Sequence, residues 1–185
     1  MKFKAPAFLM ALALVAPLAL AAKADSPALP AAATADQVTT SKLVYGLLSD
    51  SRYAYRPRAL DEATSKDVFK RYLETLDGAK QYFTQADVAR FAPFEANISS
   101  AIRGGELEPA FQVFAVYKQR VGERVAYARK LLKQEPDFTT DERFEYDRKK
   151  VPWAASNAEL DELWRKSVKN DWLRLKLAGK KPDDI

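Results

Sequence analysis

The sequence predicts an all-α fold of about five helices with one long central helix, and three observations predict it. Apolar residues recur at three- and four-residue steps over most of the chain, which is the pattern of helices with one apolar face. Ser, Thr or Asp precedes most of these stretches, and Gly or Pro follows them, as expected at helix starts and stops. No alternating run is long enough to predict a strand.

Length and composition exclude several classes of function. The 185 residues suffice for one domain, and 48% apolar with 30% charged residues is typical of a folded protein. There is no cysteine and no histidine, so thiol chemistry, the commonest general base and the commonest metal ligand are all missing. We therefore expect no cofactor, no metal site and no catalytic residue in this chain.

The first residues have the pattern of a secretory signal peptide, predicted for residues 1–24. Lys2 and Lys4 supply the charged start, residues 8–20 the apolar core, and Ala22-Lys23-Ala24 the cleavage site. A membrane anchor is the alternative, but the apolar run is shorter than the ~20 residues of a span, so no stable anchor is expected after cleavage.

Cleavage after Ala24 leaves 27 basic against 25 acidic residues. So small an excess gives no argument for nucleic acid as a partner. In a bacterial host the mature chain is expected in the periplasm. Residues 25–35, with Pro27 and Pro30 among alanines, predict a flexible lead-in. Residues 36–185 are the predicted helical domain.

The first helix is predicted to start at Thr34, with Gln37 completing a capping box, and to end near Ser51. The apolar stripe assigned to it is Val38, Leu43, Val44, Leu47 and Leu48. Pro57 disfavours a helical residue before it, so residues 53–58 are expected to be extended.

Two further helices are predicted before residue 106. Asp61 caps the second, which carries an apolar stripe and ends before Gly78. Thr84 opens the third, which Gly104-Gly105 stops. Pro93 falls inside the third stretch, where it either kinks one helix or marks two short ones.

The fourth helix is the longest, predicted from Glu108 to Gln134. At ~1.5 Å per residue it would be ~40 Å long, so it is either a spine with helices on several sides or an arm reaching outward. The last helix starts at Ser156, with Glu159 as the partner of a capping box, and ends at Gly179. All three tryptophans lie in or just before it and need other elements to cover them.

A search for reactive groups finds none arranged for catalysis. The adjacent pairs Ser41-Lys42 and Ser65-Lys66 point in different directions on a helix, so neither makes a nucleophile–base pair. One segment is predicted to be a contact surface, because aromatic and basic residues alternate in it beside a proline: Arg52, Tyr53, Tyr55, Arg56 and Arg58. Docking against another part of the same protein is the favoured use. Binding of an outside ligand, such as an anionic polymer, is the alternative.

Several separate blocks of the chain resemble the start of the bacterial tail-specific proteases, also called carboxyl-terminal processing proteases. The blocks, in order, are Arg71-Tyr72-Leu73-Glu74-Thr75-Leu76-Asp77, Gln81-Tyr82-Phe83-Thr84-Gln85-Ala86-Asp87-Val88, Asp137-Phe138-Thr139, Tyr146-Asp147-Arg148 to Pro152-Trp153, Glu159-Leu160-Asp161-Glu162-Leu163-Trp164-Arg165, and Leu173 to Lys180. The resemblance covers the chain from about Leu43 onward.

The resemblance implies a non-catalytic N-terminal helical domain of a periplasmic protease. In that family a PDZ module and a serine protease core with a Ser–Lys pair follow, and no position here matches that catalytic motif. The implied partners are the PDZ and protease core of the parent protein and a periplasmic adaptor. The implied role is to scaffold the protease core and to contribute to docking of substrate or adaptor. The resemblance also implies that the sequence is a fragment of the parent protein or a truncated reading frame. The alternative is a free-standing periplasmic helical binding or adaptor protein.

Overall fold

The computed structural model describes residues 30–181, and every regular element in this range is an α-helix. The helices are α1 (Ala35–Ser49), α2 (Glu62–Asp77), α3 (Gln85–Glu95), α4 (Ile98–Gly104), α5 (Glu108–Leu131) and α6 (Asn157–Leu177). The all-α class is therefore confirmed. The predicted signal peptide, residues 1–24, and the first five residues of the lead-in lie outside the described residues. Within residues 30–181, no helix combines the length and apolar composition needed to cross a membrane.

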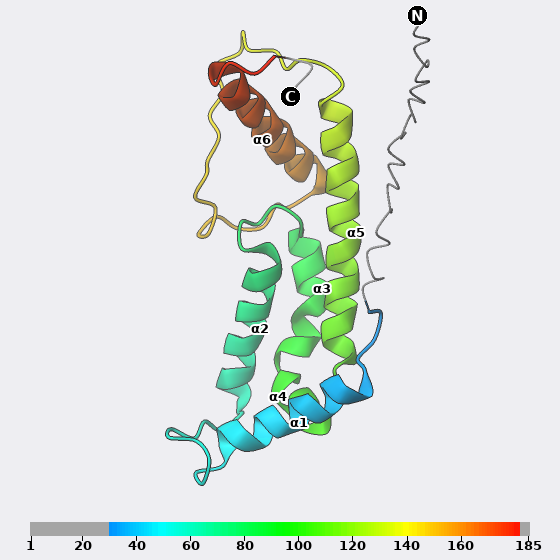
Figure 1. The fold of residues 1–185 in the computed structure, drawn as a ribbon, viewed down its shortest axis with the longest axis vertical. Helices are drawn as coiled ribbons and strands as arrows, with labels where there is room; N and C mark the ends of the chain where they lie inside the picture. Colours follow the sequence, from blue (N-terminus) through cyan, green and yellow to red (C-terminus); the bar gives the residue numbers. More distant parts are fainter. Residues whose placement is uncertain (1–29, 182–185) are drawn as a thin grey trace, which may run out of the picture.

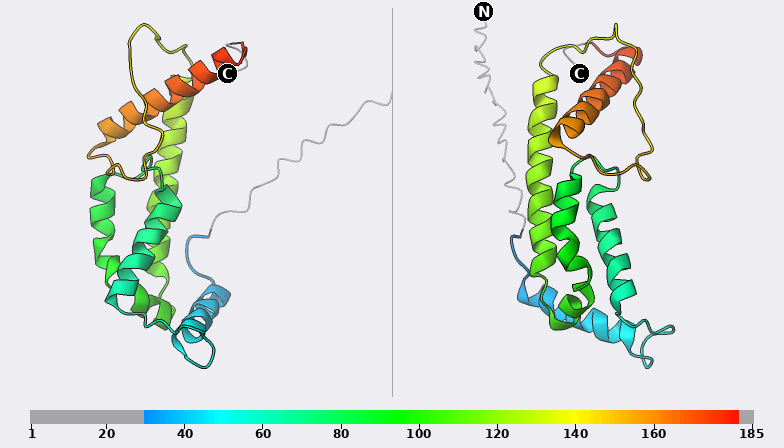
Figure 2. Two further views of the ribbon diagram at one scale, coloured as in Figure 1. Left: turned by 90° about the vertical axis from the view of Figure 1, so that its left-hand side faces the viewer. Right: turned by 180° about the vertical axis from the view of Figure 1, so that it is seen from behind.

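Helices α2, α3 and α5 stand side by side, α1 crosses their lower end, and α6 lies against the upper half of α5 (Figure 1). Two turned views show the same order, with α1 and α6 at opposite ends of the molecule (Figure 2). Because α5 packs on α3 and then on α6, it is the spine rather than the outward arm. Its regular part ends at Leu131, before the predicted Gln134, because tighter turns take over there: Lys133 N–H bonds the Lys130 carbonyl and Gln134 N–H bonds that of Leu131.

The hydrophobic core lies between α2, α3 and α5. Its buried side chains are Phe69, Leu73, Phe83, Phe91 and Val113. The rings of Phe83 and Phe91 meet edge to face with centroids 5.4 Å apart. Phe83 comes from the α2–α3 loop, so this loop is anchored in the core that it connects.

The region after Thr84 contains two helices instead of one, which gives six described helices where about five were predicted. The break falls at Ala96 and Asn97, whereas Pro93 lies inside α3. Proline removes the helical donor to the carbonyl of Ala89, and that residue is exposed, where water can bond the carbonyl instead. The sequence alternative of two short helices is confirmed, but the proline does not mark their boundary.

A buried carboxylate organises the centre of the fold. Asp77 is 2% exposed and accepts hydrogen bonds from the backbone N–H groups of Gln81 (2.7 Å), Tyr82 (3.2 Å) and Phe83 (2.9 Å). It also accepts one from the indole N–H of Trp153, at 3.1 Å. Burial raises the pKa of Asp77, although these four hydrogen bonds oppose the rise.

The same region anchors α6. The indole N–H of Trp164 donates to the Gln81 carbonyl at 2.8 Å, and the Gln85 amide donates to the Trp153 carbonyl at 2.9 Å. We call Asp77, Gln81, Phe83, Trp153 and Trp164 the Asp77 junction. The expectation that other elements cover the tryptophans is confirmed, since Trp153 and Trp164 are half-buried and Trp172 is buried.

Helix α6 starts and ends at the predicted residues, with one difference in its cap. The Ser156 hydroxyl accepts the Glu159 N–H as expected, but the Glu159 carboxylate bonds the Ala155 N–H at 2.7 Å instead of that of Ser156. Gly179 has a left-handed φ of 81°, and the N–H of Lys180 bonds the carbonyl of Leu175. This closes the helix with a Schellman motif.

Ionic contacts also hold together elements that are distant in sequence. Asp87 is buried and accepts two hydrogen bonds from Arg120, each 2.9 Å, which join α3 to α5. Glu142 pairs with Arg165 and with Lys169, the latter at 2.6 Å, and so holds the α5–α6 connection on α6. Hydrogen bonds from Arg165 and Lys169 lower the pKa of Glu142 to about 2.

Candidate docking surface

Helix α1 packs on the domain through a narrow and largely polar face. The Ser41 hydroxyl donates to the Ile102 carbonyl at 2.8 Å, where α1 crosses α4. Gly105 follows α4 with a φ of 75°, and a Cβ there would lie 2.7 Å from Val38 Cγ1. The close approach of α1 therefore depends on a glycine at the end of α4.

Four aliphatic side chains in the second half of α1 point away from the domain. Leu43 is 61% exposed, Leu47 and Leu48 are each 53% exposed, and Val44 is 43% exposed. The sequence grouped these four residues with Val38 in one stripe, whereas the structure divides the stripe between two faces. Val38, placed in that stripe, is about 140° from Leu43 at 100° per residue and lies on the opposite, inward face. The angular separation of Val38 from Leu43 could therefore have shown from the sequence alone that the two residues lie on different faces of the helix.

The loop after α1 is compact instead of extended. The Asp50 carbonyl accepts hydrogen bonds from the N–H groups of Tyr53 (3.1 Å) and Ala54 (2.9 Å), which turn the chain. The Arg58 N–H then returns to the Leu48 carbonyl at 3.0 Å. The prediction of an extended stretch over residues 53–58 is therefore wrong, because local hydrogen bonds fold it back on the end of α1.

This loop protrudes from the lower end of the molecule and carries all five residues of the predicted contact surface (Figure 1). Tyr55 is 95% exposed and Tyr53 is 66% exposed. The guanidinium of Arg52 lies 5.5 Å from the Tyr53 ring centroid, and that of Arg56 lies 5.9 Å from the Tyr55 ring centroid. The structure thus brings these residues together as two arginine–tyrosine pairs.

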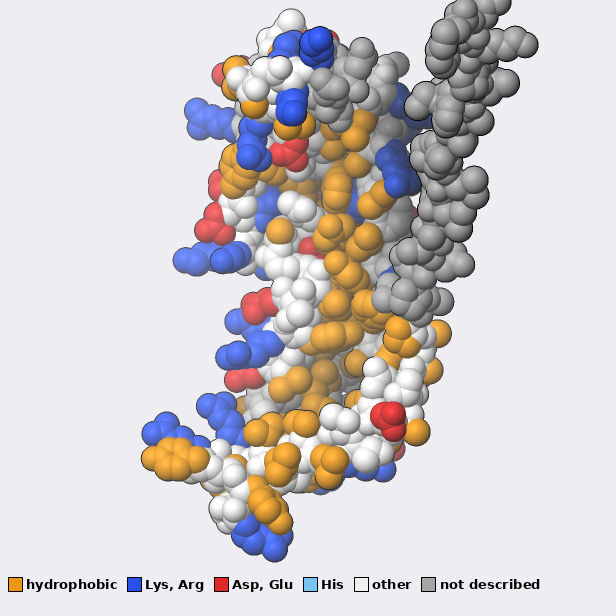
Figure 3. Space-filling model, in the orientation of Figure 1, with side chains coloured by type: hydrophobic (Ala, Val, Ile, Leu, Met, Phe, Trp, Pro, Cys, Tyr) orange, Lys and Arg blue, Asp and Glu red, His pale blue; other side chains and the backbone are white. Residues whose placement is uncertain are grey.

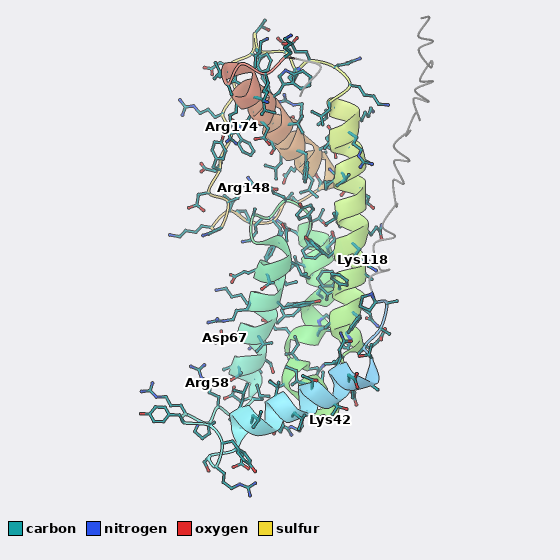
Figure 4. All side chains as sticks on the ribbon, in the orientation of Figure 1. Lys42, Arg58, Asp67, Lys118, Arg148 and Arg174 are labelled. Atoms are coloured by element: carbon teal, nitrogen blue, oxygen red, sulfur yellow. The ribbon has the colours of Figure 1, made fainter. Side chains whose placement is uncertain are left out.

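The charge of the loop is positive. The Arg52 side chain pairs with Asp50 at 2.6 Å and holds the pKa of that carboxyl below its usual range. Within residues 30–181, no carboxylate lies at ion-pair distance from Arg56 or Arg58. Figure 4 shows Arg58 where the loop returns to the base of α2. Two arginines are therefore available to a partner that brings negative charge.

We call the outward face of α1 and the loop the α1 surface, defined by Leu43, Val44, Leu47, Leu48, Arg52, Tyr53, Tyr55, Arg56 and Arg58. Hydrophobic side chains cover α1 and continue as a band between α2 and α5 (Figure 3). An apolar centre with an aromatic and arginine-rich border is the composition of protein contact sites.

The two serine–lysine pairs have structural partners. Ser65 is buried and its hydroxyl donates to the Ser99 hydroxyl, which joins α2 to α4. Lys66 pairs instead with Glu62 at 2.8 Å on the surface of α2. Ser41 is used at the α1–α4 contact described above. Among the described residues, no group of acidic side chains is arranged to hold a metal ion.

Comparison with known proteins identifies relatives for most of the chain. Residues 47–185 match the model of the tail specific protease N-terminal domain family. The chain is also similar to the tail-specific protease of Haemophilus influenzae, with 31% identity over 164 residues. That alignment covers 88% of this chain and 23% of the Haemophilus protein.

Proposed function

The chain belongs to the family of tail-specific protease N-terminal domains, and on that premise we propose that it is the non-catalytic helical domain of a periplasmic tail-specific serine protease. In this role it scaffolds the protease core and contributes to docking of substrate or adaptor. The supporting observation is the outward aliphatic face of α1 beside the Tyr53–Tyr55 loop.

The exposure of the α1 surface favours docking because water solvates aliphatic side chains poorly. Covering four aliphatic side chains by a partner would gain free energy at roughly 25 cal/mol per Å² of apolar area. The arginine–tyrosine pairs border this face, and such side chains carry much of the binding energy in protein contacts. The domain contributes a surface to the proposed assembly rather than a reactive group.

The described contacts also support a scaffolding role. The Asp77 junction satisfies its buried polar groups within the domain and joins α2, the α2–α3 loop, Trp153 and α6. The buried Asp77 carboxylate therefore needs no partner outside the domain, whereas the α1 surface is exposed to solvent. A domain that satisfies this buried carboxylate internally and exposes an apolar face on α1 is suited to positioning other parts of a longer protein.

The periplasmic location rests on the predicted signal peptide. Export and cleavage after Ala24 are measurable by N-terminal sequencing of the chain recovered from a bacterial host. The free-standing binding protein predicts a gene that stops near Ile185, whereas our proposal predicts a reading frame that continues into PDZ and protease segments.

The role of the α1 surface is tested in the whole encoded polypeptide with the double substitution Leu43→Asp and Leu47→Asp. We expect several-fold slower cleavage of a protein substrate with an apolar C-terminal tail, with unchanged thermal unfolding of the domain. Ser100→Asp, on the exposed side of α4, is the matched control and should cleave at the normal rate. Normal cleavage by the double variant would contradict the proposed docking role of the α1 surface. Cleavage of the substrate by the 185-residue chain alone would refute the proposal that this domain is non-catalytic.

A further inference from the structure

Helix α1 restricts the kind of partner that its surface can bind. Between its ends the backbone N–H and C=O groups are paired within the helix, and the N–H of Asp50 closes the end by bonding the Gly46 carbonyl. An extended segment would therefore find no free row of backbone groups along α1 to pair with, as it would at a sheet edge. The partner's contacts with α1 must come from side chains.

The four aliphatic side chains of the α1 surface form a stripe with helical spacing. Leu43 and Leu47 are four residues apart, as are Val44 and Leu48, so the two pairs make adjacent rows along the helix. Rows of this kind pack into the grooves between the rows of another helix. Because all four side chains are exposed, the domain itself does not make this contact. The surface therefore fits the apolar stripe of an amphipathic helix.

The charge beside this stripe is positive. Residues 43–60 contain three arginines and one acidic residue, Asp50, whose carboxylate is already paired with Arg52 at 2.6 Å. Arg56 and Arg58 are exposed, and the Arg56 guanidinium lies 5.9 Å from the centroid of the Tyr55 ring. A guanidinium beside a ring still has N–H groups free at its edge, and these bind carboxylates well. The matching helix is therefore one with acidic residues beside its apolar stripe.

We propose that the α1 surface binds an acidic amphipathic helix of the protein segment that docks there. The partner's apolar stripe lies on the four aliphatic side chains, and its carboxylates lie on Arg56 and Arg58. This inference rests on the proposed docking function and specifies the chemistry of the partner. A protein helix fits better than an anionic membrane surface, because the arginines follow one end of α1 instead of lining its length.

Two synthetic peptides test this chemistry by fluorescence anisotropy. The acidic probe is an amphipathic helix of about 18 residues, with leucines on one face and glutamates beside them. The basic probe has lysine in place of each glutamate. We expect the acidic peptide to bind the chain about three- to tenfold more tightly at low salt, and this preference should shrink as salt is added. Equal affinities, or no binding of either peptide, would overturn the proposal.

Charge reversal in the chain locates the binding. The double substitution Arg56→Glu and Arg58→Glu should reverse the preference, so that the basic peptide binds more tightly. Arg71→Glu with Arg90→Glu reverses the same number of charges at exposed positions of α2 and α3, and this control should keep the preference for the acidic peptide. An unchanged preference in the first variant, or a reversed one in the control, would contradict the proposal.

The whole encoded polypeptide separates this inference from the proposed function. Slower substrate cleavage by both the Leu43→Asp, Leu47→Asp variant and the Arg56→Glu, Arg58→Glu variant supports an acidic partner. Slower cleavage by the leucine variant alone leaves the docking function standing and overturns the acidic partner. Normal cleavage by the leucine variant removes the docking function and this inference with it. Sedimentation of the chain with phosphatidylglycerol vesicles, lost in either variant, would assign the surface to a membrane and contradict the proposal.

Discussion

The regions at the two ends of α2 differ in burial and hydrogen bonding of their side chains. At its C-terminal end, the Asp77 junction buries a carboxylate and gives it four donors from the same domain. At its N-terminal end, the loop after α1 exposes two tyrosines, and α1 turns its leucines outward. The hydrogen bonds of the C-terminal end are thus made within the domain, whereas the N-terminal end leaves apolar and aromatic side chains exposed to a partner.

The largest effect is expected at the junction. Asp77→Ala leaves four donors without their acceptor, and each unsatisfied buried donor costs about 1–3 kcal/mol, so the free energy of unfolding should fall by about 4 kcal/mol or more. Urea unfolding followed by circular dichroism measures this. Asp67→Ala, on the outer side of α2 (Figure 4), is the matched control with little expected change. Equal stability of the two variants would show that Asp77 does not organise the junction.

A matched pair of leucine truncations sharpens the comparison. Leu160 in α6 is fully buried and Leu47 in α1 is half exposed. Leu160→Ala should lower the free energy of unfolding by about 3 kcal/mol through lost burial and a cavity, and Leu47→Ala by no more than about 0.5 kcal/mol. The same unfolding curves measure both. A large loss for Leu47→Ala would mean that α1 completes the core.

The Asp87–Arg120 contact predicts a pH-dependent effect. Burial alone would raise the pKa of Asp87, but hydrogen bonds from Arg120 and Thr84 outweigh it and leave the pKa below its usual range. Arg120→Met removes this partner and should destabilise the fold by roughly 2 kcal/mol at neutral pH.

The sign of the pH effect follows from linkage. A carboxyl with a depressed pKa in the folded state contributes stability above its unfolded pKa of about 3.9, and this stability is lost as pH falls through the folded value. The difference between wild type and Arg120→Met should therefore shrink below about pH 4. A difference that stays constant down to pH 2 would assign the effect to packing instead of charge.

The smallest effect on stability is expected in the loop. Tyr55→Ala should change the free energy of unfolding by less than about 0.5 kcal/mol, because the side chain is 95% exposed. Its effect should instead fall on binding to a partner. A drop of several degrees in the unfolding temperature would place Tyr55 among the structural residues.

Local sequence signals predicted the helices well. The capping residues Thr34, Asp61, Thr84 and Ser156 all cap the helices assigned to them. These signals act over three or four residues, so they can be read without knowledge of the fold. The position of the break at Asn97 could not be predicted from the nearby proline, because Pro93 is tolerated inside α3.

Tertiary features were harder to predict. Nothing local to Asp77 shows that it accepts from Trp153, which lies 76 residues away in the chain. The outward turn of α1 depends on what packs against it, here α4 and Gly105, and periodicity alone does not say which face is covered. The five residues of the predicted contact segment lie on an exposed loop, and their use in contact remains a prediction. The apolar stripe predicted beside them did not indicate which way its leucines face.

Hydrogen exchange of residues 43–58, compared between this chain and the whole encoded polypeptide, tests the central claim most directly. We expect slower exchange of these amides in the whole polypeptide, since the docked segment would cover the α1 surface, and equal exchange at Gln81 and Phe83 in both. Equal exchange of residues 43–58 in the two proteins would contradict the account.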